Sequence, residues 1–134
     1  MKISWLMMCL AAAIALGGCN RQDTTVQRNV VTEITITCET EAGPIHRRYT
    51  SQDKMRSVLL YIRSVSSPFS APDVSEEGET QVRITTVSAD KTTKIYHQLG
   101  QRYFREGEDG WKIIDPEKGA NLWRLIKLLP SDPE

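Results

Sequence analysis

Four short segments between residues 81 and 114 alternate apolar and polar side chains with a period of two. They cover residues 81–87, 93–99, 102–106 and 111–114. The turns between them are rich in small and polar residues: Ser88-Ala89-Asp90-Lys91, Gly100-Gln101 and Gly107-Glu108-Asp109-Gly110. Because such short connections join antiparallel neighbours and cannot make a parallel crossover, this stretch predicts a four-stranded antiparallel meander.

A further pair of strands is predicted upstream. From Val30 to Glu39, apolar residues of one parity alternate with Thr and Glu of the other, which is typical of a half-buried strand. The turn signal at residues 41–44 (Glu-Ala-Gly-Pro) favours a return strand over residues 45–49. Cys38 shares the parity of Ile34 and Ile36, so we expect its thiol to be packed in the core.

Two segments have the spacing of amphipathic helices. Thr50-Ser51-Gln52-Asp53 is typical of a capping box, and an apolar stripe follows until Ser66-Ser67-Pro68: Met55, Val58, Leu59, Ile62 and Val65. The second helix begins at Asp115-Pro116-Glu117, carries the stripe Leu122, Leu125, Ile126 and Leu129, and ends at Pro130. Residues 66–79 form a loop rich in Ser, Pro and acidic residues, with Phe69 expected against the core.

These elements predict the α+β class with one antiparallel sheet, both helices on one face of it, and a single domain over residues 30–134. The order of strand hairpin, helix, four strands and helix resembles the TATA-binding-protein-like fold, β-α-β4-α. The resemblance concerns topology alone, and no DNA-binding motif accompanies it. It therefore implies a fold and no function.

Composition excludes several classes of protein. With 40% hydrophobic and 25% charged residues, neither a disordered chain nor a multi-pass membrane protein is expected. Basic and acidic residues number 17 each, and loss of Lys2 with a signal peptide leaves 16 against 17. This balance argues against binding of nucleic acid through phosphate neutralisation.

The N-terminus has the order of an export signal. Lys2 precedes an apolar run from Ile3 to Leu16 that is too short for a membrane-spanning helix. The ending Leu16-Gly17-Gly18-Cys19 resembles the lipobox of bacterial lipoproteins. The resemblance implies a signal peptide over residues 1–18, an acyl lipid such as palmitate on Cys19, a tether over residues 19–29, and a domain on the extracytoplasmic face of the cell membrane. The alternative is an ordinary secretory signal that happens to contain a cysteine.

Residues for catalysis or metal binding are sparse. His46 and His97 are far apart in sequence, and no nucleophile elbow or regular metal-ligand spacing accompanies them. His97 is expected to be a core residue beside Ile95 and Leu99. The acidic residues Glu106, Glu108 and Asp109 cluster at one turn. We therefore expect no catalytic residue, no metal and no cofactor.

The most suggestive surface is the predicted second face of the meander. If Val82, Ile84, Ile95, Leu99 and Ile113 face the helices, the other parity carries a basic and aromatic set: Arg83, Lys94, Tyr96, Arg102, Phe104 and Lys112. Such a face is suited to an anionic ligand. The alternative is a solvated sheet face whose cations only confer solubility, and a one-residue slip of register would reverse the assignment.

The sequence therefore predicts a membrane-anchored lipoprotein that acts as a non-catalytic binding module. The expected partners are the membrane, through the lipid on Cys19, and an anionic envelope component or another protein, with no nucleic acid. A structural or assembly accessory that pairs through a sheet edge or a helix face is the first alternative. A small hydrolase is the second, and it requires a pocket with converging titratable groups.

Overall fold

The computed structural model describes residues 30–133 as an α+β fold with one antiparallel sheet and two helices, which confirms the predicted class. The predictions for residues 1–29, including the signal peptide, Cys19 and the tether, lie outside the described residues. The elements in chain order are β1 (Val31–Thr40), β2 (Gly43–Tyr49), α2 (Gln52–Ser64), β3 (Gln81–Ser88), β4 (Thr93–Leu99), β5 (Tyr103–Glu106), β6 (Lys112–Ile113) and α3 (Pro116–Leu128).

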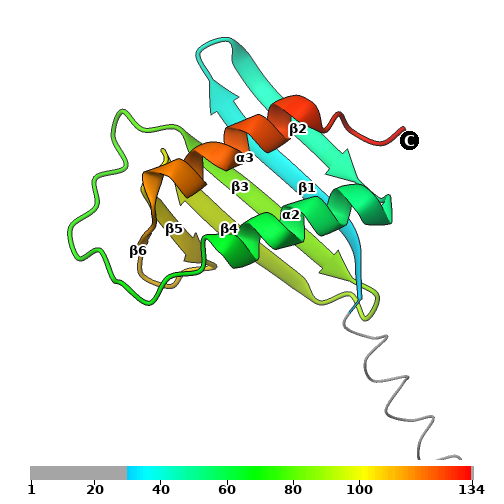
Figure 1. Ribbon diagram of the computed structural model, residues 1–134, viewed down its shortest axis with the longest axis horizontal. Coiled ribbons are helices and arrows are strands. Elements are labelled where there is room, and N and C mark those ends of the chain that lie inside the picture. Colours follow the sequence, from blue (N-terminus) through cyan, green and yellow to red (C-terminus); the bar gives the residue numbers. More distant parts are fainter. Residues whose placement is uncertain (1–29, 134) are drawn as a thin grey trace, which may run out of the picture.

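The six strands lie in the order β2-β1-β3-β4-β5-β6, and every neighbouring pair is antiparallel. Figure 1 shows α2 and α3 side by side on the same face of this sheet. We call this the helix face, and the opposite side the far face. No helix among residues 30–133 has the length and apolar character needed to cross a membrane.

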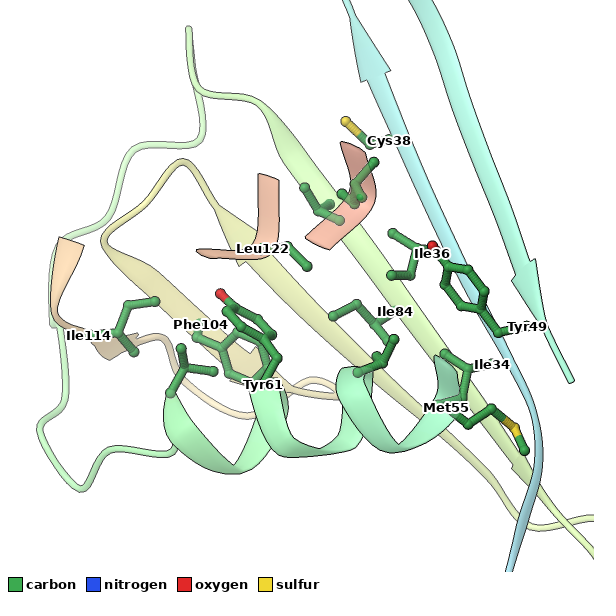
Figure 2. Packing of buried hydrophobic residues seen from close by; sticks show 14 residues of the cluster. Ile34, Ile36, Cys38, Tyr49, Met55, Tyr61, Ile84, Phe104, Ile114 and Leu122 are labelled. Atoms are coloured by element: carbon green, nitrogen blue, oxygen red, sulfur yellow. The ribbon is translucent and has the colours of Figure 1, made fainter. Parts of the chain in front are cut away.

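The core fills the layer between the helices and the sheet (Figure 2). Ile34 and Ile36 of β1 and Ile84 of β3 point into it and are fully buried. Burial of each such side chain contributes about 1.5–3 kcal/mol of transfer free energy. Cys38 packs in the same layer with 5% of its surface exposed, which confirms the prediction, and burial together with the nearby Glu39 carboxylate raises the pKa of its thiol.

Helix α2 packs through Met55, Val58 and Tyr61, and its C-cap residue Val65 is also buried, whereas Leu59 of the predicted stripe is 37% exposed. The prediction that Leu59 lies in the core is therefore wrong. The buried positions are spaced by three, three and four residues, which is the spacing of one helix face. Tyr61 lies on this face, in place of the aliphatic Leu59 that the predicted stripe included. Phe69, expected against the core, is also exposed.

The N-terminus of α2 is capped from the far end of the chain. Ser51 is the N-cap residue but makes no capping bond with its own side chain. Instead, Oδ2 of Asp132 accepts hydrogen bonds from the backbone N–H groups of Thr50 (2.7 Å) and Ser51 (2.8 Å), and Oδ1 lies 3.0 Å from Nζ of Lys54. These contacts correct the predicted capping box, and they fasten residues after α3 to the start of α2.

Asp132→Asn is expected to lower the urea midpoint at pH 7, with a smaller effect in acid. The backbone hydrogen bonds and Lys54 hold the pKa of the Asp132 carboxyl well below its usual range. A depressed pKa in the folded state stabilises the protein above the unfolded-state value of about 3.9, and this stabilisation disappears as pH falls through the folded-state pKa. The midpoints of wild type and variant should therefore converge below about pH 4. A difference that is constant from pH 7 to pH 2 would contradict this origin.

Candidate functional site

The six predicted surface residues do not share one face of the sheet. Arg83 lies on the far face, as predicted, but its partner in β4 is His97, and the helix-facing Ile84 is paired with Tyr96. Four of the six therefore belong to the helix face: Lys94, Tyr96, Phe104 and Lys112. Arg102 lies in the turn before β5 and lines a separate hollow at the sheet end, with Gly100 and Trp123.

The predicted parity of β4 is wrong by one residue. Ile95 and Leu99, expected to face the helices, lie on the far face, and Ile113 lies there as well. The helix-facing position between Tyr96 and the turn is Gln98, a fully buried amide that hydropathy assigns to the solvent. This strand has apolar residues at both odd and even positions, so the alternation of its side chains does not determine which set faces the helices.

The four helix-face residues meet in one groove between the C-terminal half of α2 and strands β4, β5 and β6. The groove has a volume of about 560 Å³. Its lining comprises Leu59, Ile62, Arg63, Val65, Ser66, Ser67, Lys94, Tyr96, Phe104, Arg105, Glu106, Asp109, Gly110 and Lys112. We call it the α2 groove. The sequence thus identified four residues that do lie together, although on the opposite face from the one expected.

The apolar part of the α2 groove is formed by rings and aliphatic side chains. Tyr96 and Phe104, neighbours across β4 and β5, stack with their ring centroids 5.9 Å apart. Phe104 and Val65 are buried, whereas Ile62 is only partly buried and Leu59 is exposed. Apolar surface is therefore accessible here beside the closed core, and removing it from water would favour binding of an apolar group.

Positive charge surrounds this apolar surface. Within residues 30–133 the ion pairs are Arg48–Glu33 and Lys54–Asp132, so Arg63 and Lys94 have no acidic partner within 4.0 Å. Lys112 makes one contact, from Nζ to Oγ of Ser70 at 3.3 Å. A cation without an intramolecular partner keeps its charge available for a bound anion.

Two carboxylates also line the groove, those of Glu106 and Asp109, and Glu106 forms a hydrogen bond with Tyr96. Burial raises the pKa of Tyr96, and the charge of Glu106 and its hydrogen bond with the tyrosine side chain raise it further. Tyr96 therefore stays neutral at physiological pH. The second carboxylate, Asp109, belongs to the β5–β6 turn.

Sequence reasoning missed the helix wall of the α2 groove, which consists of Leu59, Ile62 and Arg63. Leu59 and Ile62 were interpreted as part of a core stripe, and Arg63 was not singled out. The sequence did contain a signal for this wall. Leu59 and Leu60 make the apolar face of the helix wider than the face that packs on the sheet, and Leu60 is 55% exposed.

Other candidate chemistry is dispersed. His46 lies on β2 and His97 on β4, with β1 and β3 between them. Among residues 30–133, no three His, Cys, Asp or Glu side chains converge as metal ligands. His97 is buried, as predicted, but on the far face and not under the helices. The expectations of no catalysis, no metal and no cofactor remain predictions.

Comparison of the chain with protein-family models, with curated proteins and with solved structures found no match in any of the three.

Proposed function

We propose that this protein is a lipid-anchored, extracytoplasmic binding module that holds an anionic, partly apolar envelope component in the α2 groove without transforming it. One observation carries the proposal: cations that have no acidic partner within residues 30–133 lie around accessible apolar surface in a single hollow. An amphiphilic anion matches both properties, because its charged group can contact Lys94 and Arg63 while its apolar part covers Leu59 and Ile62.

The anchor rests on the N-terminal sequence. Leu16-Gly17-Gly18-Cys19 resembles a lipobox, and an acylated Cys19 would hold the domain at the extracytoplasmic face of the cell membrane. A short tether would keep the α2 groove close to an envelope ligand and raise the ligand's effective concentration. Cys19→Ser should leave the chain uncleaved and without lipid. If that variant is processed and acylated like wild type, the anchor is wrong.

We also propose that the order of elements corresponds to a TATA-binding-protein-like arrangement with a four-stranded meander. The support is the sequence of a hairpin, a helix, β3 to β6 at successive positions in the sheet, and a final helix. In this interpretation β2 is an added edge strand. The likeness bears on topology alone and not on the ligand.

Assembly through a sheet edge is a weaker alternative, because contacts within the chain occupy part of each edge. On β2, the N–H of Arg48 donates to Oγ of Ser131 (3.0 Å), its carbonyl accepts from Asp132 N–H (2.9 Å), and Pro44 has no N–H. On β6, the N–H of Ile113 donates to the carbonyl of Phe69 (2.8 Å). Edges occupied in this way are poor templates for a further strand.

The proposed function is tested by co-sedimentation of residues 26–134, which keep every described element, with fractionated envelopes. We expect Lys94→Glu/Lys112→Glu to weaken saturable binding at least tenfold, because the double variant replaces two attractive charges with two repulsive ones. Binding by the wild type should also fall as salt is added. Leu59→Ser, at an exposed position, should weaken binding through loss of apolar contact alone and with little effect of salt.

Arg102→Glu is the matched control, because it reverses an arginine charge outside the α2 groove. It should bind like wild type. If the Arg102 variant loses binding as fully as the lysine variant, or if the folded lysine variant binds normally, the α2 groove is not the binding site.

A further inference from the structure

A row of polar side chains crosses the far face of the sheet, opposite the α2 groove. Each member is the direct antiparallel partner of the next, from β2 through β1, β3 and β4 to β5. The row consists of His46, Thr37, Arg83, His97 and Arg105. Neighbouring strands are about 4.8 Å apart. Arg83 and Arg105 lie on the strands on either side of His97, so the backbones of the two arginines are about twice that distance from each other.

Three members of this row have donors that lack an acceptor in the described chain. Arg83 has no ion pair among residues 30–133. Nε of Arg105 is buried and has no hydrogen-bond partner among the residues that the structure describes. A buried donor without an acceptor is unfavourable, and native structures avoid it unless a ligand or solvent completes the site.

His97 completes the set of donors. Its side chain is 7% exposed, and Nδ1 lies 3.1 Å from Nε2 of Gln81. Because an amide nitrogen can only donate, Nδ1 accepts this hydrogen bond and the proton of the neutral ring is on Nε2. Nε2–H is therefore a third donor on this face, in a residue whose cross-strand partners are Arg83 and Arg105.

The surroundings keep this row ordered and the imidazole neutral. Trp111 supports Arg105, whose guanidinium carbon lies 4.5 Å from the centre of the indole ring. Burial lowers the pKa of His97, and Arg105 and Arg83 lower it further, against the opposing effects of Glu108 and Glu76. Neither carboxylate comes within 4.0 Å of an arginine of the row.

We propose that Arg83, His97 and Arg105 form a second binding site, on the far face, that takes a phosphate group. A tetrahedral phosphate presents several acceptor oxygens and can therefore accept from donors on three neighbouring strands, with arginine forks at either side. A planar carboxylate would be satisfied by one arginine and would leave the other donors without an acceptor. The site does not depend on the proposed role of the α2 groove, although Arg105 is also among the residues that line that groove.

The test is titration of the full chain, held in a non-ionic detergent, with inorganic phosphate at constant ionic strength. His46 and His97 are the two histidines of the sequence, so imidazole nitrogen–proton NMR spectra report on them directly. We expect saturable shifts of the His97 ring signals, and at least tenfold weaker binding in Arg83→Gln and in Arg105→Gln. Arg102→Gln, outside the row, should bind phosphate like wild type, and so should Lys94→Glu/Lys112→Glu in the α2 groove.

Arg105 supports Trp111 as well as the site, so its variant could unfold. Arg83 is exposed, and its variant then decides the question. The proposal is wrong if phosphate leaves the His97 signals unmoved, if chloride at equal ionic strength moves them as far, or if a folded Arg83→Gln chain binds phosphate as wild type does.

Discussion

Gln98→Leu is expected to lower the free energy of unfolding by about 3 kcal/mol, although it places an apolar side chain at a fully buried position. The Gln98 amide joins three elements. Nε2 donates to the carbonyls of Gly100 (2.9 Å) and Gly119 (3.0 Å), and Oε1 accepts from the hydroxyl of Tyr61. A leucine has nearly the same volume but leaves each of these groups without its partner.

The largest single cost of this substitution is expected at the Tyr61 hydroxyl. Its pKa is raised by burial, so it remains a neutral donor over the whole physiological range. Without Gln98 it must stay buried and unpaired, which costs about 1–3 kcal/mol by itself. The network also connects α2, β4 and α3, so its loss should loosen both helices together.

A double-mutant cycle separates these contributions. Tyr61→Phe removes the hydroxyl and should cost about 1 kcal/mol, because it leaves one acceptor of Gln98 unfilled. In the double variant Gln98→Leu/Tyr61→Phe no buried hydroxyl is left unpaired, so the total cost should be smaller than the sum of the two single costs. Urea denaturation followed by circular dichroism measures all three. Additive costs, or a Gln98→Leu protein as stable as wild type, would show that the network contributes little.

Local signals in the sequence were sufficient to predict most elements. The start of α3 is an example, since Oδ1 of Asp115 accepts a hydrogen bond from Glu117 N–H at 2.9 Å, two residues away. The cap of α2 is the opposite case, because its carboxylate belongs to Asp132, 81 residues after Ser51. No local pattern reports a contact that the tertiary fold creates.

The candidate sites show the same division. Charge and aromatic content pointed to Lys94, Tyr96, Phe104 and Lys112 as a group, and these residues do line one hollow. Their face was wrong, because a buried Gln98 in β4 reverses the apparent parity of the strand. The cross-strand row was invisible for the same reason: it depends on His97 lying opposite Arg83, which only the register determines.

The close fit that allows Gln98 to reach α3 depends on a glycine within that helix. Gly119 is buried, and a Cβ atom at this position would overlap the carbonyl oxygen of Gln101 and lie 2.8 Å from its carbonyl carbon. The obstacle is backbone of the β4–β5 turn, not the flexible end of a side chain. The first turn of α3 must therefore move away from the sheet to accommodate any side chain.

Gly119→Ala should consequently destabilise the protein by about 3 kcal/mol. Helix propensity alone predicts the opposite, because alanine is about 1 kcal/mol more favourable than glycine inside a helix. A shift of α3 also stretches the hydrogen bond from Gln98 to the Gly119 carbonyl, so the steric and polar losses add. For a domain of this size the melting temperature should fall by roughly 10 °C or more.

Ala120→Gly is the control, since it exchanges the same two residue types at the next position of α3, which is only partly buried. It should cost only about 1 kcal/mol, the propensity difference. Thermal and urea unfolding of both variants thus compare two contributions to stability, the steric overlap at position 119 and the helix propensity at position 120. A Gly119→Ala protein that matches or exceeds the stability of wild type would mean that α3 can shift freely. In that case its docking on the β4–β5 turn does not fix the position of the helix.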